Sequence, residues 1–291
     1  SFQSFVTAMR KVHGPERTRQ WLAAMKENGT RRYAKNTPII KALADGQIEE
    51  AFGLVRRRLD GTPLAYILGH REFYGLEFAV DRDVLIPRQE TELLVDNVLQ
   101  FASDRELKGP VSVANVGTGS GAVGVSVAVH VPQATVYATD ISMEALRVAD
   151  VNRRRHGVES RLHLVQSDLL QGLGGTFDVI VSNPPYIRSE DMTSLAADVG
   201  QEPSRALDGG ASGLAVTERL LQQASSLLRS GGLVLVEIAS DQLKPTLALA
   251  KHTIPGARVS FARDLLGLPR VVSAALGQRT ESPPQAHGRR A

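Results

Sequence analysis

The chain has 291 residues, of which 42% are hydrophobic and 22% charged, with a formal net charge of +3 and no cysteine. These proportions are ordinary for a globular protein, the length allows a large domain and a small one, and no stretch reaches the roughly 18 apolar residues of a membrane span. The lack of cysteine excludes disulfides, thiolate catalysis and cysteine-based zinc sites, and since no metal-ligand spacing is present we expect no bound metal.

Residues 1–60 are predicted to form a small helical domain, because apolar side chains recur at helical spacing in residues 2–9, 21–25 and 48–59. Arginine is frequent here, which fits either a nucleic-acid or ribonucleoprotein partner or an ordinary solvated surface. No signal-peptide pattern opens the chain, so we expect a cytoplasmic location. Because the first residue is Ser1 rather than Met, a mitochondrial matrix location after loss of a transit peptide is the alternative.

Residues 61–88 differ in character, since glycine and proline punctuate aromatic and β-branched residues. We predict a hairpin or linker between two domains there. A helix is predicted to begin near Glu90, with Leu94, Val98 and Phe101 on one face.

From residue 111 onward, strand and helix patterns alternate. The strand candidates are 111–116, 134–139, 162–166, 177–182, 232–238, 258–263 and 270–275. Helical patterns lie between the first five strands, most clearly at 121–130, 142–154 and 214–229, with Ser142 as an N-cap. Residues 89–277 are therefore predicted to form an α/β domain with a doubly wound, seven-stranded, mostly parallel sheet. The last two strands are close enough for an antiparallel edge hairpin, and residues 278–291 are predicted to be a disordered tail.

A glycine-rich turn follows the first of these strands. Glycines at a strand-to-helix turn let the backbone approach a ligand and leave N–H groups free at the start of the helix. Asp140 ends the next strand, where a carboxylate can accept both hydroxyls of a ribose. We therefore expect a nucleoside-containing cofactor to be held by Gly117, Thr118, Gly119, Ser120, Gly121 and Asp140.

Two classes of cofactor fit this stretch. Gly119, Gly121 and Gly124 form a G-x-G-x-x-G pattern with Asp140 about 20 residues on, as in nicotinamide dehydrogenases. The spacing Gly117-x-Gly119-x-Gly121 is instead common in S-adenosylmethionine enzymes. The proline-rich segment that follows the fourth strand favours the second class, because it has no role in hydride transfer.

The third strand is followed by Asp168 and Leu169. Asp168 is predicted to accept a hydrogen bond from the amino group of adenine, and Leu169 to pack on the ring. A helix N-cap is the alternative role for Asp168.

The fourth strand runs into Asn183-Pro184-Pro185-Tyr186. Two prolines cannot continue a sheet ladder and hold their carbonyl oxygens rigidly outward. The Asn183 side chain adds another acceptor, and Tyr186 adds a flat wall. The segment is therefore predicted to cradle a planar NH2 group, with both hydrogens accepted and the ring stacked against it.

Several segments match a known family. They are residues 63–69 (Pro-Leu-Ala-Tyr-Ile-Leu-Gly), 71–76 (Arg-Glu-Phe-Tyr-Gly-Leu), 85–92 (Leu-Ile-Pro-Arg-Gln-Glu-Thr-Glu), 115–121, 182–187, 202–203, 206–210 and 213–214. Over residues 48–276 the chain resembles the release-factor glutamine methyltransferases. Asn-Pro-Pro-Tyr alone would also fit DNA or RNA amino-methyltransferases, but residues 71–76 and 85–92 resemble the region between the two domains of the release-factor family.

This resemblance implies a helical substrate-recognition domain followed by a methyltransferase domain that uses S-adenosylmethionine. It also implies methyl transfer to the side-chain amide nitrogen of the glutamine in the Gly-Gly-Gln motif of a peptide chain release factor, near the ribosome. In the matching residues, the 117–121 turn and Asp140 hold the cofactor, Asn183 touches both cofactor and substrate, and Pro184, Pro185 and Tyr186 hold the glutamine. The chain departs from the family at Asn115, Gln89 and Ala239, where Asp, Pro and Gly are usual.

An amide nitrogen is a poor nucleophile because its lone pair is delocalised into the carbonyl group. We expect the Asn183 side-chain oxygen and the Pro184 carbonyl oxygen to accept its two hydrogens and aim it at the methyl group. Two alternatives stay open: a nucleic-acid amino-methyltransferase with the same cradle, and an inactive scaffold that keeps the fold. Binding of S-adenosylmethionine would separate the scaffold from both enzymes.

Overall fold

A computed structural model describes residues 16, 20, 48–104 and 109–277 of the chain. The apolar stripes expected at 2–9 and 21–25, and the tail expected at 278–291, lie outside the described residues. The described residues form two compact units: one contains those up to Gly69 together with Ala197–Gln201, and the other contains His70–Ala196 and those from Glu202 onward. The domain boundaries expected at residues 60 and 88 stay predictions.

The first unit contains the helices α3 (Ile48–Leu59) and α4 (Leu64–Leu68) and the 3₁₀ turn η3 (Val199–Gln201). The third apolar stripe, at residues 48–59, coincides with α3. The helix α4 was not expected, because residues 61–88 predicted only a hairpin or linker. It ends at Gly69, whose φ of 75° is the left-handed conformation that glycine adopts without strain.

The second unit opens with an antiparallel hairpin of β1 (His70–Phe73) and β2 (Leu76–Ala79). Its main sheet has seven strands in the order β5-β4-β3-β6-β7-β9-β8. Strands β3 to β7 are parallel to one another and β9 is antiparallel to both β7 and β8, so the predicted fold class is confirmed. The strands are β3 (Val111–Val116), β4 (Ala134–Asp140), β5 (Leu162–Gln166), β6 (Phe177–Ser182), β7 (Leu228–Glu237), β8 (Ala257–Arg263) and β9 (Pro269–Leu276).

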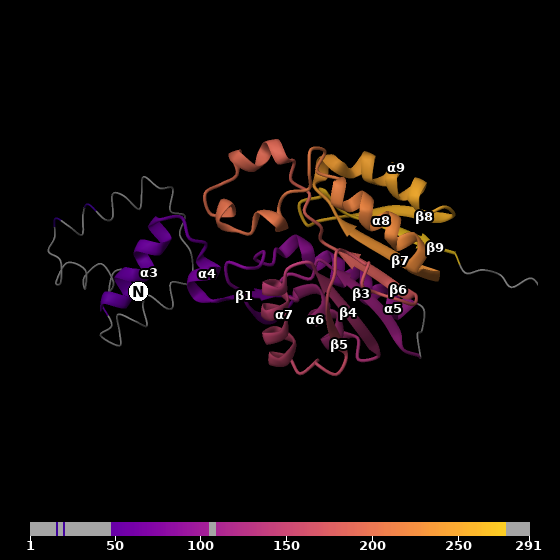
Figure 1. Ribbon diagram of the computed structural model, residues 1–291, viewed down its shortest axis with the longest axis horizontal. Helices are drawn as coiled ribbons and strands as arrows, with labels where there is room; N and C mark the ends of the chain where they lie inside the picture. The colour runs from indigo at the N-terminus through magenta and orange to yellow at the C-terminus, as the bar shows by residue number, and fades with distance from the viewer. Residues whose placement is uncertain (1–15, 17–19, 21–47, 105–108, 278–291) are drawn as a thin grey trace, which may run out of the picture. The chain divides into compact units, whose positions relative to one another are not determined.

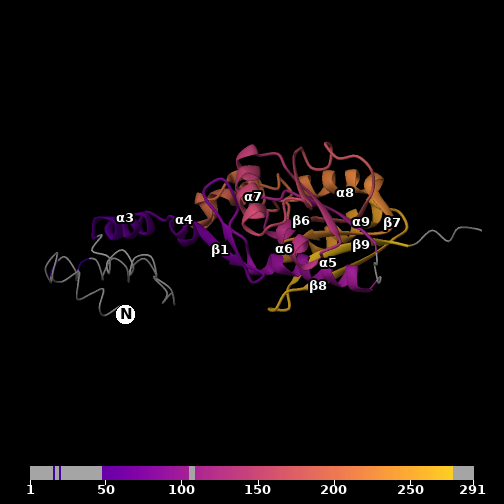
Figure 2. The ribbon, with the colours of Figure 1, turned by 90° about the horizontal axis from the view of Figure 1, so that it is seen from below.

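Helices cover both faces of this sheet (Figures 1 and 2). One core is formed by the sheet with α5 (Glu92–Asp104) and α6 (Ala122–His130), and α7 (Met143–Arg155) packs beside α6. A second core on the other face is formed with α8 (Ala215–Leu227) and α9 (Leu243–Thr253). Short 3₁₀ turns complete this unit: η1 (Gln89–Thr91), η2 (Ser189–Ser194), η4 (Ser204–Ala206) and η5 (Ser240–Gln242).

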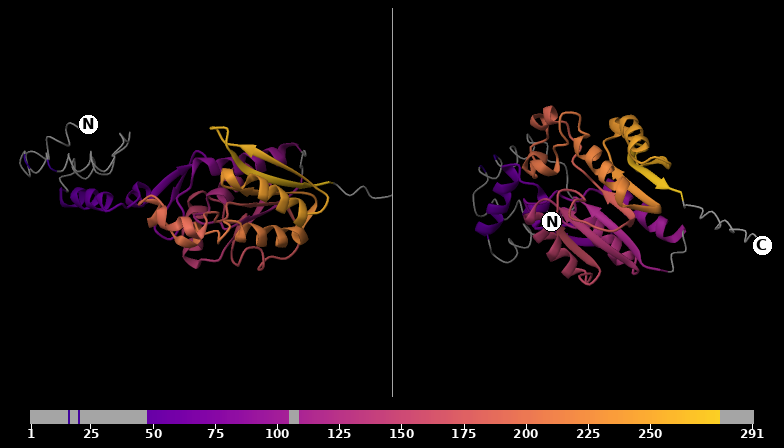
Figure 3. Two further views of the ribbon diagram at one scale, coloured as in Figure 1. Left: turned by 90° about the horizontal axis from the view of Figure 1, so that it is seen from above. Right: turned by 45° about the vertical axis from the view of Figure 1, so that its right-hand side comes forward.

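Most expected elements are found within one or two residues of their predicted bounds. Ser142 is the N-cap of α7, as expected, because its Oγ accepts a hydrogen bond from the Ala145 N–H at 3.2 Å. The antiparallel β8–β9 hairpin is also confirmed and is drawn in yellow in Figure 3. Two expectations were wrong. No helix connects β5 to β6, because that connection is a short turn with three glycines, and β7 begins at Leu228, four residues before the predicted 232.

Candidate active site

The order of the strands sets the location of the candidate site. β4 and β5 lie on one side of β3, while β6 and β7 lie on the other, so the topological switch point falls between β3 and β6. Ligands of doubly wound sheets bind beyond the carboxyl ends of the strands at such a point. The glycine turn follows β3 and Asn183 follows β6, so the predicted cofactor and acceptor segments adjoin across the switch point.

The glycine turn combines left-handed backbone with open space. Gly117 and Gly119 have φ values of 65° and 54°, which other residues adopt only with strain. A Cβ atom at either position would meet no atom within 4 Å outside its chain neighbours. Gly121 has the same left-handed backbone, with a φ of 84°, and in addition its Cβ would lie 3.3 Å from that of Ala149 in α7. The turn therefore exposes bare backbone at the carboxyl edge of the sheet.

The side chains of the turn point inward. The Thr118 hydroxyl donates to Asn115 Oδ1 at 2.7 Å, and the carbonyl of buried Ser120 accepts from Asn152 Nδ2 at 2.8 Å. Asn115 Oδ1 also accepts from the Gly124 N–H at 3.1 Å. Asn115, where the family that the sequence resembles usually has Asp, is thus a buried side chain that holds the turn in place by hydrogen bonds. Any contact of Thr118 or Ser120 with a cofactor would have to use their backbone.

Asp140 joins the end of β4 to this turn. Its Oδ2 accepts from the Gly119 N–H at 2.9 Å and its Oδ1 accepts from the Ser142 N–H at 3.0 Å. Burial raises the pKa of Asp140, although these backbone hydrogen bonds and the charge of Arg205 act in the opposite direction. The structure therefore brings together the glycine turn and the predicted ribose-binding carboxylate.

The predicted adenine contacts lie beyond β5. Asp168 is paired with Arg219 of α8, so its carboxylate already has a cationic partner. Leu169 has a φ of 56°, which is unusual for a residue other than glycine and stores strain at this turn. Neither feature was expected from the sequence, and the adenine contacts stay predictions.

The acceptor segment is held by residues that sequence reasoning passed over. Asn183 is partly buried and donates from Nδ2 to Thr91 Oγ1 at 3.1 Å. The buried Gln242 side chain donates from Nε2 to the Tyr186 carbonyl at 2.9 Å. Among the described residues no hydrogen bond reaches the Pro184 carbonyl oxygen or Asn183 Oδ1. Two acceptors of the predicted cradle are therefore free of internal partners.

The glycine-rich loop that contains Gly209 packs against the acceptor segment. A Cβ atom on Gly209 would lie 2.7 Å from the Pro185 carbonyl oxygen and 2.8 Å from Tyr186 Cα. The Ile187 N–H donates to the Leu207 carbonyl at 2.9 Å, and the Gly209 N–H donates to the Ile187 carbonyl at 2.7 Å. Close packing of backbone on backbone thus fixes the segment, and only glycine fits at residue 209.

Gly209→Ala should lower the rate of the methyl transfer that the sequence resemblance implies by about tenfold or more, because small displacements of positioning groups cost that much. The affinity for the methyl donor should stay the same, since the glycine turn is untouched. Gly174→Ala is the matched control, because an added Cβ there meets no atom within 4 Å. Steady-state kinetics with both variants checks the prediction, and equal rates would mean that residue 209 does not set the geometry of the acceptor segment.

Arg88 and Glu202 form an ion pair in which the Glu202 side chain is 2% exposed and that of Arg88 is 34% exposed. Glu202 Oε2 also accepts from the Ile86 N–H at 3.0 Å. The pair ties the segment before α5 to the loop that carries residues 206–210. Removing one partner of a buried pair leaves the other charge and its hydrogen-bond partners uncompensated.

Glu202→Ala should lower the free energy of unfolding by about 2–3 kcal/mol, less than for a fully buried pair because Arg88 can rehydrate. Urea denaturation followed by circular dichroism measures the loss. Glu159→Ala, at an exposed glutamate, should leave the midpoint unchanged. A midpoint for Glu202→Ala equal to that of this control would show that the pair contributes nothing to stability.

Two titratable groups border the acceptor segment. Burial and, after it, the charge of the nearby Glu237 raise the pKa of Tyr186 to about 12, so the phenol stays neutral at physiological pH. Burial raises the pKa of Glu237 to about 7, against the lowering effects of a hydrogen bond with Thr91 and the charge of Arg270.

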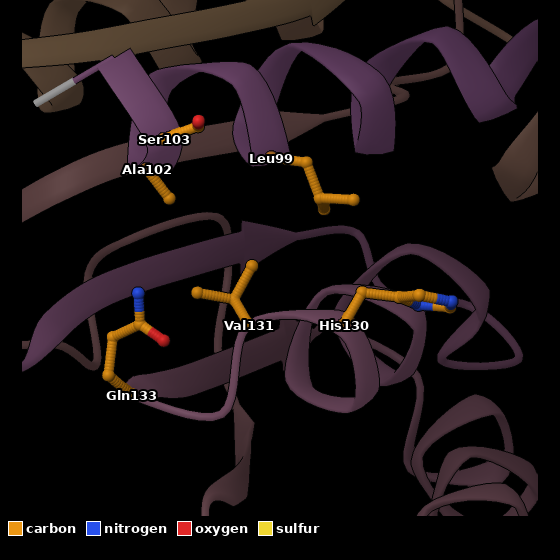
Figure 4. Close-up of a pocket in the computed structure, with 6 residues that line it drawn as sticks. All are labelled: Leu99, Ala102, Ser103, His130, Val131 and Gln133. Atoms are coloured by element: carbon orange, nitrogen blue, oxygen red, sulfur yellow. The ribbon is translucent and has the colours of Figure 1, made fainter. Parts of the chain in front are cut away.

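A small pocket lies at the other end of the sheet, between the end of α5 and the loop after α6 (Figure 4), lined by Leu99, Ala102, Ser103, His130, Val131 and Gln133. It adjoins the start of β4, so it lies at the amino ends of the parallel strands and not where such sheets bind ligands.

In the described part of the chain, no three histidine, aspartate or glutamate side chains are grouped to hold a metal ion. No helix in that same part is long and apolar enough to cross a membrane.

Known proteins resemble this chain in both sequence and fold. The family model for the methyltransferase small domain matches residues 89–210. The release factor glutamine methyltransferase of Moorella thermoacetica is 47% identical over 198 residues, which are 68% of this chain and 69% of that protein. The protein of the same name from Clostridium acetobutylicum is 36% identical over 239 residues, 81% of this chain and 82% of that one.

A solved methyltransferase structure from Pyrococcus furiosus is similar in fold, with a TM-score of 0.51 and 22% sequence identity, and the match covers 70% of this chain and 90% of that one. At this identity the likeness concerns the fold alone.

Proposed function

The chain belongs to the release factor glutamine methyltransferases, and from this premise we propose that it methylates the side-chain amide nitrogen of the glutamine in the Gly-Gly-Gln motif of a peptide chain release factor. The single structural observation that supports this reaction is a pair of acceptors, Asn183 Oδ1 and the Pro184 carbonyl oxygen, that have no hydrogen-bond partner in the part of the chain that the structure describes. Two acceptors match the two hydrogens of a primary amide.

S-adenosylmethionine is the methyl donor, and the residues present fit it. The bare backbone at Gly117 and Gly119 leaves room for a ligand at the carboxyl edge, and Asp140 offers a carboxylate for the ribose hydroxyls. Gly121 and the backbone of Thr118 and Ser120 would complete that surface. The donor supplies a methyl group made electrophilic by its sulfonium sulfur.

The acceptor residues orient the glutamine. Asn183 Oδ1 and the Pro184 carbonyl accept its amide hydrogens and so fix the amide plane, with the nitrogen lone pair perpendicular to that plane and one face of it open to the methyl donor. The same acceptors stabilise the positive charge that grows on nitrogen, and preorganised dipoles of this kind are each worth about 3 kcal/mol. Tyr186 and Pro185 form the walls against which the amide stacks, while contacts of Asp168 and Leu169 with adenine stay predictions.

No residue needs to remove a proton before the methyl group moves, because the nitrogen becomes acidic only once it is methylated. Tyr186 cannot act as a base near neutral pH, since its pKa of about 12 keeps the phenol protonated. The proton is therefore released after transfer. This order agrees with an acceptor segment built from hydrogen-bond acceptors and prolines.

The proposed partner is the release factor, and a site of action close to the ribosome stays a prediction. We also propose a cytoplasmic location, on the ground that the relatives are bacterial proteins, and the mitochondrial alternative stays a prediction.

A competition assay tests the class of substrate. Purified protein is incubated with radiolabelled S-adenosylmethionine and equal amounts of a release factor and total RNA. The proposed function expects label in the protein fraction alone. Label in RNA and none in the release factor would overturn it and favour the nucleic-acid amino-methyltransferase.

A further inference from the structure

A buried carboxyl group lies beside the acceptor segment without a role in the reaction described so far. β6 and β7 are parallel neighbours with Ser182 level with Val236, so Asn183 and Glu237 are the next residues along adjacent strands at the same edge. Glu237 is 1% exposed, and its Oε2 has no hydrogen-bond partner among the described residues. Burying such a group is costly, which suggests that it is retained for a purpose.

Thr91 connects this carboxyl group to Asn183. It is 5% exposed and ends the 3₁₀ turn η1, immediately before α5. Its Oγ1 accepts a 3.1 Å hydrogen bond from Asn183 Nδ2, and its hydroxyl is close enough to the Glu237 carboxyl to lower the pKa of that carboxyl. Three side chains from three elements that are distant in sequence therefore meet beside the acceptor segment.

The direction of each bond follows from the proton count. A threonine hydroxyl has one hydrogen, and an ionised carboxylate only accepts. Above the pKa of about 7 that burial gives Glu237, the carboxylate is ionised and can take that hydrogen, so Thr91 can offer Asn183 only a lone pair. The amide of Asn183 must then turn Nδ2 towards Thr91 and Oδ1 away from it, because the flipped amide would place two acceptor oxygens together.

We propose that Thr91 and Glu237 are positioning residues that lock the Asn183 side-chain amide so that Oδ1, and not Nδ2, faces the substrate. This inference rests on the proposed function, in which Oδ1 accepts a hydrogen of the glutamine amide. A flipped Asn183 would present Nδ2 to the substrate NH2 group, and two donors would face each other.

Thr91→Val keeps the shape of the side chain and removes its hydroxyl. Its kcat should fall about 100-fold, as for loss of one preorganised dipole, while KM for the release factor and Kd for S-adenosylmethionine stay within about threefold. Thr91→Ser restores the hydroxyl and should recover kcat to within about threefold of the wild type. The matched control is Thr246→Val in α9, a fully buried threonine whose Oγ1 has no partner among the described residues.

A second readout does not depend on turnover. The side-chain NH2 resonances of Asn183 are identified by nuclear magnetic resonance through their loss in Asn183→Asp. In the wild type and Thr91→Ser these protons should exchange slowly with water, because Nδ2 donates to Thr91. In Thr91→Val they should shift and exchange faster, and in Thr246→Val they should match the wild type.

Glu237→Gln tests the carboxylate. A glutamine amide can turn its NH2 group towards Thr91, whose hydrogen is then free for Asn183 Oδ1, so kcat should fall about tenfold or more without a change in Kd for S-adenosylmethionine. Wild-type kcat in Glu237→Gln would remove Glu237 from the proposal.

The proposed function and the positioning role of Thr91 can fail separately. If the wild-type protein methylates a release factor but Thr91→Val keeps its kcat and its Asn183 resonances, the positioning proposal is overturned and the function stands. If the wild type transfers no methyl group to the release factor, the function fails, and the resonance comparison still decides whether Thr91 holds Asn183.

Discussion

Asn183→Ala should lower methyl transfer at least about 100-fold, the loss expected when one preorganised dipole is removed from a reacting centre. The substitution deletes Oδ1, one of the two acceptors for the substrate amide, and it also removes the hydrogen bond from Nδ2 to Thr91. Binding of S-adenosylmethionine should be largely unchanged, because the glycine turn and Asp140 belong to other strands. Single-turnover transfer to a release factor, with calorimetric titration of the cofactor, measures both quantities.

Asn97→Ala is the matched control for this variant. Asn97 lies on α5, and its Nδ2 donates to the Leu93 carbonyl within the same helix at 2.6 Å. The control should transfer methyl groups at the wild-type rate. Turnover by Asn183→Ala within about threefold of that rate would show that the cradle is not the acceptor site.

Asp140→Ala should instead raise Kd for S-adenosylmethionine about 100-fold, because hydrogen bonds to a charged group contribute about 1.5–3 kcal/mol each. The effect has two parts in this structure: the ribose loses its acceptor, and the Gly119 and Ser142 N–H groups lose theirs. The rate of transfer at saturating cofactor should fall much less than the affinity.

Asp140→Asn separates these two parts. The amide keeps one acceptor oxygen for the turn and loses the charge, so its Kd should lie between those of the wild type and Asp140→Ala. Asp150→Ala is the control, since Asp150 pairs only with Arg153 and Arg154 on its own helix among the described residues. A Kd for Asp140→Ala equal to that of this control would remove Asp140 from the cofactor site.

The sequence predicted the sheet well because each buried strand is a local apolar run that a single chain segment displays. The prediction of helices and strands failed where the local amino-acid composition is unusual for the element that forms. The start of β7 contains Gly231 and Gly232, which break a strand pattern, and α9 contains Pro245, which a helix tolerates only in its first turn. The helix expected between β5 and β6 is absent because ten residues rich in glycine form a turn more readily.

The site was predicted only where it follows the ends of strands. Gly117, Asp140 and Asn183 could be placed at one edge because parallel strands end together. Thr91, Gln242 and Gly209 act through contacts across long sequence separations, which no local pattern reveals. Thr91 was singled out only as part of the 85–92 segment, and its meeting with Asn183 and Glu237 required the register of β6 and β7.

The most direct test of the account is peptide mass spectrometry of a release factor incubated with this protein and S-adenosylmethionine. The account predicts one added methyl group, located by fragmentation on the glutamine side chain of the Gly-Gly-Gln peptide, and none with Asn183→Ala. An unmodified Gly-Gly-Gln peptide, from a reaction in which calorimetry shows that the cofactor binds, would contradict it.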